Sequence, residues 1–226
     1  MPSILHIESA TPICSVALSK GDQLIDLKEI DKFNSHSEVL TLFVDELLNT
    51  NGLKYKDLDA IAVSNGPGSY TGLRIGASTA KGLAYALDIP VITVNSIEAL
   101  AIGLKESFPD SGNKNYLYCP MIDARRMEVY TTFYDASHQV IKALTPFIID
   151  EENLKSFLEK YTLILGGSGA EKCFEIYKSY NNIILDSELK SSAKYLIPLA
   201  IEKYRLKNFA DLAYFEPNYL KDFIGK

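Results

Sequence analysis

The segment from Gly66 to Gly76, GPGSYTGLRIG, has the composition of a phosphate-binding turn. It follows a short apolar segment and precedes a helical pattern, and backbone N–H groups at a helix start can hold an anion where glycines leave them accessible. The P-loop pattern fails because no Lys-Ser/Thr pair follows a glycine at the required spacing. The dinucleotide fingerprint also fails, because Thr71 occupies the position of its third glycine. Spacing alone therefore favours a tight turn, capped by Ser69 or Thr71, over a phosphate cradle.

Two carboxylates form a second candidate for chemistry. Glu8 and Asp123 each end the first predicted strand of one half of the chain. If the halves are related by symmetry, these side chains face each other across a cleft, where carboxylates can hold Mg²⁺ through water. The alternative is two polar strand ends exposed at a sheet edge, and the sequence leaves both possibilities open.

Histidines and cysteines form no metal or nucleophile pattern. His6, His36 and His138 have neither HxxxH nor HxxEH spacing, and the three cysteines are far apart with no CxxC pair. There is no GxSxG motif, and Cys14 lies within a predicted strand without a histidine near it in sequence. We expect structural or surface histidines, reduced thiols and no metal site.

The apolar periodicity predicts the same order of elements twice, namely three strands followed by alternating helices and strands. In the first half the strands are expected at 4–7, 14–19, 24–30, 59–63 and 91–94, and the helices at 36–50, 71–87 and 96–105. In the second half the strands are expected at 116–122, 127–134, 140–148, 163–165 and 183–185, and the helices at 151–158, from about 170 to 178, and 191–205.

This order predicts an α/β protein of two similar lobes, each a mixed sheet with helices on its faces. A segment dense in turn formers at 108–113 separates the repeats, so the lobes are expected at 1–107 and 108–226.

Two helices of the first lobe carry more apolar and small side chains than one core requires. The apolar residues of 36–50 cover an arc of roughly 240°, whereas a helix on its own core needs about 100° or somewhat more. Helix 71–87 has two adjacent rows of small residues, one beginning at Gly72 and the other at Ser78, although each helical glycine costs about 1 kcal/mol relative to alanine. Packing on the helix's own sheet explains one row more readily than two. The expected partner interface is Val39, Leu40, Phe43, Val44, Leu47, Gly72, Leu73, Ile75, Gly76, Ala80 and Leu83.

Composition narrows the class of protein further. The 226 residues are 47% hydrophobic and 23% charged, as in a packed domain, and carry a formal charge of −6. This net negative charge argues against a protein that binds nucleic-acid phosphates without a partner. No apolar stretch has the roughly 20 residues that span a bilayer, and no secretion signal precedes the first strand, so we expect a cytoplasmic protein without membrane contact.

Four segments resemble the TsaB (YeaZ) family, the bacterial partner subunits in the synthesis of threonylcarbamoyladenosine at position 37 of tRNA. They are ILHIESA at 4–10, SNGPGSYTGLRIG at 64–76, IDAR with EVY at 122–130, and EPNYL at 216–220. The similarity extends over essentially the whole chain, and the central segment is the most specific. It implies the duplicated RNase H-like, actin-like ATPase (ASKHA, Hsp70/actin) fold, in agreement with the repeat.

The resemblance also implies a role. TsaB-like proteins are regarded as non-catalytic dimerisation partners of TsaD, which transfers the threonylcarbamoyl group, and act with the ATPase TsaE. Such a chain would contact tRNA mainly through the complex, and whether it is a homodimer when alone stays open. In TsaD a histidine pair binds a metal after the strand equivalent to 91–94, whereas this chain has NSIEAL there, so that metal site is expected to be absent.

The phosphate signatures of the ATPase fold are degraded in this sequence. Neither hairpin, Glu8-Ser9-Ala10-Thr11 or Asp123-Ala124-Arg125, has the expected glycine, and a residue with a Cβ obstructs close backbone approach to phosphate. We therefore expect no cofactor and weak or no ATP binding. The degenerate nucleotide cleft would consist of Glu8, Ser9, Thr11, Gly66, Gly68, Ser69, Asp123, Gly166 and Gly167.

The alternative hypothesis is a stand-alone enzyme of the same fold. An ATP-dependent kinase would need an intact phosphate site and a catalytic base, for which Asp123 is the candidate. A glycoprotease-type metallopeptidase would need ligands that three histidines in this spacing do not supply.

Overall fold

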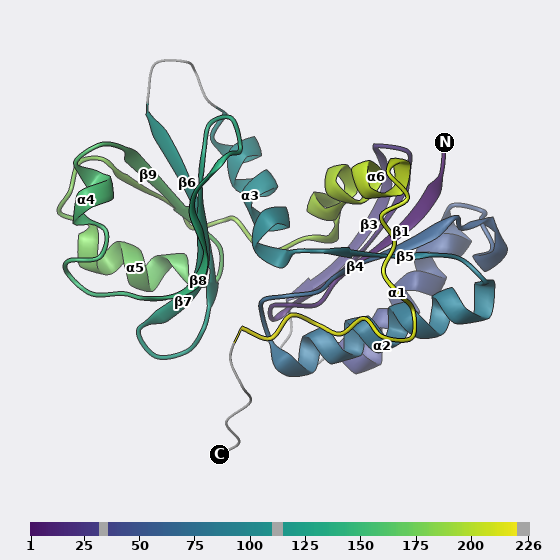
Figure 1. Ribbon diagram of the computed structural model, residues 1–226. Coiled ribbons are helices and arrows are strands. Elements are labelled where there is room, and N and C mark those ends of the chain that lie inside the picture. The colour runs from purple at the N-terminus through teal and green to yellow at the C-terminus, as the bar shows by residue number, and fades with distance from the viewer. Residues whose placement is uncertain (32–35, 110–114, 221–226) are drawn as a thin grey trace. The chain divides into compact units, whose positions relative to one another are not determined.

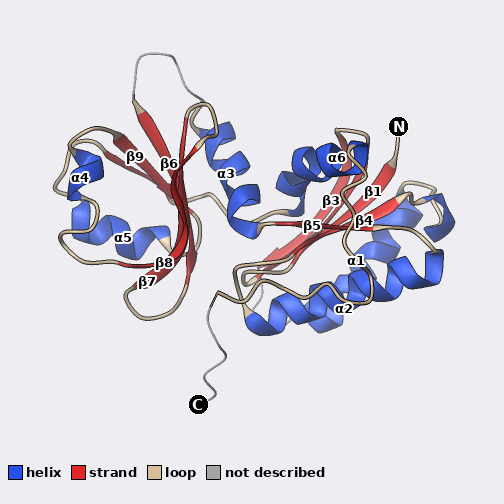
Figure 2. Cartoon of the chain, in the orientation of Figure 1, coloured by secondary structure: helices blue, strands red, loops and turns tan. Residues whose placement is uncertain are grey.

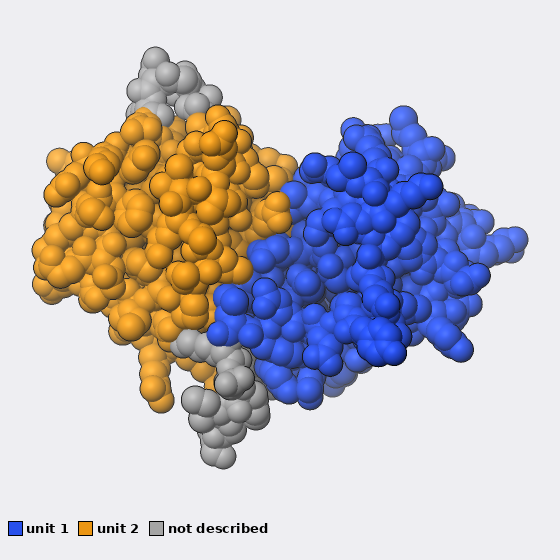
Figure 3. Space-filling model, viewed as in Figure 1, with its two compact units in different colours: residues 1–96, 191–226 blue, residues 97–190 orange. Residues whose placement is uncertain are grey.

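The computed structural model describes residues 1–31, 36–109 and 115–220, which form two compact units. Unit 1 consists of Met1–Ser96 and the chain from Ser191 onward, and unit 2 consists of Ile97–Lys190 (Figure 3). Each unit contains one five-stranded sheet with helices packed on it (Figure 2).

The sheet of unit 1 has the strand order β3-β2-β1-β4-β5. Its strands are β1 (Ser3–Glu8), β2 (Ile13–Lys20), β3 (Gln23–Asp31), β4 (Ala60–Ser64) and β5 (Val91–Val94). The first three pair antiparallel, and β4 and β5 join in parallel. Helices α1 (His36–Thr50) and α2 (Tyr70–Leu87) cover one face of this sheet, and α6 (Ile197–Arg205) lies on the other (Figure 1).

The sheet of unit 2 repeats this topology with the order β8-β7-β6-β9-β10. Its strands are β6 (Tyr116–Asp123), β7 (Glu128–Asp135), β8 (Val140–Ile148), β9 (Thr162–Gly166) and β10 (Ile183–Asp186). Its helices are α3 (Ser96–Ser107), α4 (Lys155–Leu158) and α5 (Ala170–Tyr177). The duplicated α/β pattern that the sequence predicts is therefore confirmed.

The two units differ from the lobes predicted at 1–107 and 108–226. Helix α3 belongs to unit 2, where Leu100 and Leu104 contact the Gly166–Gly167 turn. The chain after Ser191 returns to unit 1, because Lys203 of α6 donates a hydrogen bond to the carbonyl of Thr93 at 2.7 Å. The turn-rich residues 110–113 lie outside the described part of the chain.

Two predicted helices are shorter than expected. The prediction of 151–158 reduces to α4, because Asp150 accepts hydrogen bonds from the backbone N–H groups of Glu152 and Asn153 and forms a turn before the helix. The prediction of 191–205 divides into a 3₁₀ turn at Ala193–Leu196 and then α6, which has Pro198 in its first turn. Proline suits a helix start because its missing N–H is not needed there.

Candidate functional site

The first hairpin turn, residues 8–11, lies directly against the start of α2. A Cβ added at Gly68 would collide with the carbonyl of Ala10, and one added at Gly72 with the carbonyl of Ser9. Gly76 likewise lies against the Ser9 hydroxyl. The Ser69 amide donates a hydrogen bond to the Ala10 carbonyl at 2.7 Å. These glycines therefore serve close packing of the helix on its own hairpin.

Glu8 is buried rather than exposed at a sheet edge, with 1% of its surface accessible. Its Oε1 accepts hydrogen bonds from the backbone N–H of Ala10 at 2.6 Å and from the hydroxyl of Ser64 at 3.0 Å. Burial raises the pKa of this carboxyl from 4.5 to about 7, and the hydrogen bonds from Ala10 and Ser64 only partly oppose that rise. Glu8 is thus a structural acceptor that joins β1 to β4, a poor arrangement for holding Mg²⁺ from solvent.

The Gly66 turn is closed by the chain's own C-terminal segment. Gly66 has φ +102°, and its N–H and C=O both bond to Ser96, at 3.1 and 2.9 Å. The Asn218 amide donates to the Asn65 carbonyl at 2.6 Å, and the Asn218 carbonyl lies where a side chain at Gly66 would have to go. Backbone groups that a phosphate would need are therefore engaged within unit 1.

An aromatic cluster that sequence reasoning missed holds this C-terminal segment at the start of α2. The rings of Tyr70 and Tyr219 lie 4.7 Å apart, and the Arg74 guanidinium lies over the Tyr70 ring at 4.3 Å. Further along α2, Lys81 lies 4.5 Å from the Phe215 ring. The available signal was Tyr219 of the EPNYL segment, a segment that already belongs to the family resemblance.

The second hairpin turn, in unit 2, is occupied by a lysine. Lys172 of α5 forms an ion pair with Asp123 and donates to the carbonyls of Arg126 and Glu128 at 2.8 and 2.6 Å. The Asp123 carboxylate also accepts the N–H of Arg125 at 2.9 Å. Asp123, half exposed, is therefore already neutralised by a cation of its own unit.

The remaining residues of the predicted nucleotide cleft also pack against other parts of their own unit. Thr11 is buried, and its carbonyl accepts a hydrogen bond from His36 at 3.0 Å. Gly166 lies against Leu104 and Leu189, and Gly167 against Leu100 and the Met121 carbonyl. The glycine-rich turn of unit 2 is thus filled by apolar side chains of that unit.

The residues predicted as a partner interface divide by burial. Seven lie inside unit 1, namely Leu40, Val44, Leu47, Gly72, Leu73, Gly76 and Ala80. Four are half-buried at the edge of the unit 1 core, namely Val39, Phe43, Ile75 and Leu83. The row that begins at Gly72 is thus explained by packing within the unit.

Other residues on these helices are open to solvent. Leu42 is 56% exposed and Tyr85 is 82% exposed. A Cβ added at Gly82 would meet no atom within 4 Å. We define the outer face of α1 and α2 by these residues together with the half-buried apolar ones: Val39, Leu42, Phe43, Ile75, Gly82, Leu83 and Tyr85.

The described residues offer neither a metal site nor a membrane-spanning helix. They contain no group of three or more His, Cys, Asp or Glu residues placed to hold a metal ion. No helix among them is long and apolar enough to cross a membrane.

The sequence and fold match proteins of one family. The family profile described as TsaD, tRNA N6-adenosine threonylcarbamoyltransferase, matches residues 32–184. The tRNA threonylcarbamoyladenosine biosynthesis protein TsaB of Escherichia coli is 30% identical over 97% of this chain and 94% of that protein. This chain belongs to the TsaB family. The TsaB of Bacillus subtilis is 35% identical over 64% of this chain, and that alignment spans 60% of the B. subtilis protein.

Solved structures confirm the TsaB-type, actin-like fold. A Pseudomonas aeruginosa protein with similarity to the peptidase YeaZ superposes with a TM-score of 0.80, at 24% identity, over 98% of this chain and 100% of the other. The activator of 2-hydroxyisocaproyl-CoA dehydratase from Clostridium difficile, with bound ADPNP, superposes with a TM-score of 0.52 at 8% identity, over 91% of this chain and 97% of the other. The fold is therefore one that holds a nucleotide in that distant relative.

Proposed function

We propose that this chain is the non-catalytic partner subunit in tRNA threonylcarbamoyladenosine biosynthesis, acting with TsaD and TsaE. Membership of the TsaB family supports the pathway, since the relatives carry that name. One observation supports the non-catalytic role above others: the chain's own groups occupy both hairpin turns. Glu8 and the start of α2 close the first, and Lys172 neutralises Asp123 in the second.

This observation bears on the stand-alone enzyme hypothesis. A kinase needs backbone donors and a metal-binding carboxylate that are accessible to nucleotide phosphates. Here the carboxylate of Glu8 is buried, and the N–H of Gly66 is bonded to Ser96. We expect the purified chain to bind ATP weakly or not at all. ATP hydrolysis or peptide cleavage by the chain alone, abolished in Asp123→Ala, would favour the enzyme instead.

The outer face of α1 and α2 is the proposed partner surface. It combines half-buried apolar side chains with the exposed Leu42 and an unfilled position at Gly82. A glycine with open space above it lets another helix backbone approach closely. We propose that TsaD docks here, and that a second copy of the chain takes its place when TsaD is absent.

Substitutions at solvent-exposed positions test this surface without disturbing the core. Leu42→Glu is preferable to any change at Leu40, because Leu40 is buried and a charge there would unfold unit 1. Gly82→Gln should fold at least as well as the parent, since glutamine favours helix and its Cβ meets no neighbour. Val140→Glu is the matched control, because Val140 is 57% exposed and lies in unit 2.

The decisive assay measures modified adenosine in tRNA with this chain, TsaD and TsaE, omitting each in turn. We expect no product without any one of them. Leu42→Glu and Gly82→Gln should lose both TsaD capture and product, whereas Val140→Glu keeps both. Full product in the absence of this chain would refute the subunit role, and full capture by both variants would refute the surface.

A further inference from the structure

A concave site at the end of unit 1 has no part in the proposed partner surface. Its volume is about 360 Å³, near the lower limit of small-ligand sites. One wall is the end of α6, with Tyr204, Arg205 and the following Lys207. The other is formed by Pro2 and the β2–β3 turn at Gly21 and Asp22. The Gly21 amide donates to the Pro2 carbonyl at 2.8 Å, which holds this second wall together.

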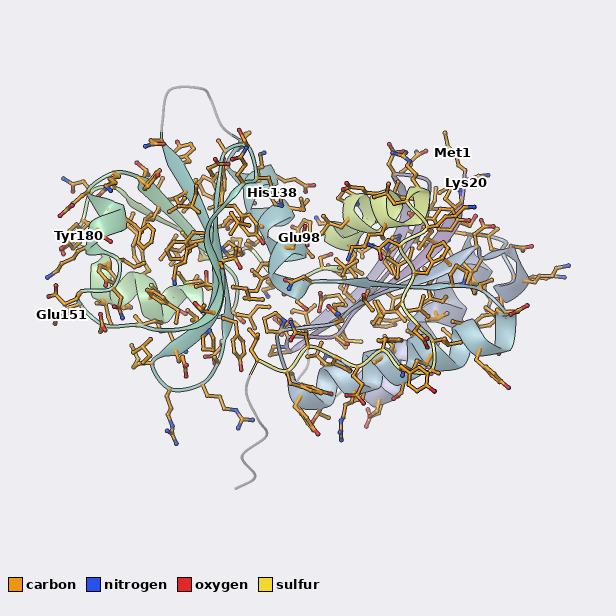
Figure 4. All side chains as sticks on the ribbon, viewed as in Figure 1. Met1, Lys20, Glu98, His138, Glu151 and Tyr180 are labelled. Carbon is orange, nitrogen blue, oxygen red and sulfur yellow. The ribbon has the colours of Figure 1, made fainter. Side chains whose placement is uncertain are left out.

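The cations at this site have no carboxylate partner. Arg205 and Lys207 are exposed, and neither forms an ion pair with any described residue. Lys203, by contrast, is bonded to the Thr93 carbonyl and contributes to the fold. Lys20 lies opposite Ser3 in the β1–β2 ladder and therefore adds another exposed cation beside Met1 (Figure 4). Asp22 is the one acidic side chain among the residues that line the site.

An aromatic ring lines the same site as Arg205 and Lys207. Tyr204 is half-buried and lines the site, and its ring makes an edge contact with the Phe209 ring, with 5.8 Å between the ring centroids. Ring faces stack with nucleic-acid bases at about 1–3 kcal/mol per base, whereas guanidinium and ammonium groups bind the phosphates between them. An aromatic ring and exposed cations on one wall of the site therefore supply the two kinds of group that bind single-stranded RNA.

We propose that this site binds a single-stranded segment of RNA, with a base on Tyr204 and phosphates on Arg205 and Lys207. The occupant is the tRNA substrate, so the inference rests on the proposed function. A charge of −6 makes binding over the whole surface unfavourable, so the contact must be local. Helix α6 lies on the opposite face of the unit 1 sheet from α1 and α2, so the site stays open when a partner covers that pair (Figure 1).

Two matched charge changes test the proposal on the complex with TsaD, using a substrate tRNA transcript as the probe. Arg205→Gln with Lys207→Gln removes two positive charges at the site. Lys56→Gln with Lys160→Gln removes two from exposed positions elsewhere. We expect the first pair to weaken tRNA binding at least fivefold. It should also lower the slope of log affinity against log salt by about 1.4, since each phosphate contact to a single strand contributes about 0.7.

Two single changes test the chemistry of the site itself. Tyr204→Leu should weaken tRNA binding about fivefold or more, since a base would lose its stacking surface. Asp22→Asn should tighten binding, because it removes the one negative charge on the cavity wall, whereas Glu188→Gln in unit 2 should not.

The result that overturns the proposal is separable from failure of the proposed function. The site would be refuted if the variant with Arg205→Gln and Lys207→Gln had the same tRNA affinity and salt slope as the control variant with Lys56→Gln and Lys160→Gln. Unchanged tRNA binding by Tyr204→Leu would refute it as well. TsaD capture and the omission assay report the subunit role independently. If the chain does not capture TsaD, tRNA binding by the chain alone at low salt provides the same comparison of variants.

Discussion

Replacing Glu8 by glutamine should change how the stability of unit 1 depends on pH. The buried carboxyl accepts hydrogen bonds from Ala10 and Ser64, and the amide oxygen of glutamine can accept the same two. The substitution therefore keeps the size and the acceptor while removing the ionisation. Any difference that varies with pH between the two proteins then reports the titration of this one group.

The magnitude follows from the raised pKa. Burial raises the pKa of Glu8 from 4.5 to about 7, so between these pH values the folded state holds a proton that the unfolded state has released. Stability contributed by Glu8 is present below pH 4.5 and is lost as the pH rises toward 7. At 1.36 kcal/mol for each pH unit, the loss is about 3 kcal/mol. Glu8→Gln should therefore gain about 3 kcal/mol relative to the parent over this range.

A second buried group hides this effect in the parent protein. Burial lowers the pKa of His6 from 6.5 to about 3. Below pH 6.5 this histidine therefore binds a proton in the unfolded state but stays neutral in the folded state. Stability contributed by neutral His6 is therefore lost as the pH falls. Between pH 4.5 and 6.5 the two trends oppose each other, and the parent should show a nearly flat profile from this pair.

The assay is urea unfolding, followed by circular dichroism, of the parent and Glu8→Gln from about pH 4.5 to about pH 8. Subtracting the two profiles cancels His6 and every other group that the proteins share. Glu38→Gln, an exposed change on α1, is the control for the loss of one carboxyl group. A constant difference for Glu8→Gln would refute the reasoning, because it would mean that Glu8 is ionised in the fold as it is in water.

Two further pairs of variants test the packing around α2. Gly72→Ala should destabilise unit 1 by about 1–3 kcal/mol, because the added Cβ meets the Ser9 carbonyl. Gly82→Ala should instead stabilise unit 1 by up to about 1 kcal/mol. The urea midpoints of the two variants measure this difference, and equal shifts of the midpoint would contradict the packing. Tyr219→Ala should release the C-terminal segment, seen as faster amide hydrogen exchange at 210–219, since a ring pair contributes about 0.5–1.5 kcal/mol. Tyr214→Ala should leave exchange unchanged because that ring is 83% exposed.

The fold was predictable because local patterns determine most of it. Alternating residues gave the antiparallel hairpins, and helical periodicity gave α1 with its observed bounds and α2 to within one residue. The return of the chain to unit 1 was not predictable, because it depends on contacts between distant segments. The bridge between Val91 and Ala210 is one such contact, and neither residue indicates it locally.

The sequence predicts which residues form the two hairpin turns and the glycine turns, but it does not predict whether their groups are free or already bonded. The hairpin and glycine turns were identified as the degenerate nucleotide positions from the family pattern. Whether the groups of these turns are free to bind a ligand depends on which other segments of the chain pack against them. The burial of Glu8 requires Ser64 beside it, and the neutralisation of Asp123 requires Lys172 from a helix 49 residues away. Sequence spacing carries no information about either the Glu8–Ser64 contact or the Asp123–Lys172 contact.

The two rows of small residues on α2 show why burial is needed to choose a partner surface. Periodicity places both rows side by side, and the sequence cannot say which of them faces the sheet. The structure assigns the row of Gly72 to the hairpin, where a larger residue cannot fit. Gly82, in the other row, is exposed with free space above its Cα, so the fold gives no reason for a residue that costs about 1 kcal/mol there. The proposed docking of TsaD on this face would supply that reason, because a glycine lets another helix backbone approach closely. Loss of TsaD capture in a stable Gly82→Gln variant is the result that supports it, and full capture by that variant would contradict it.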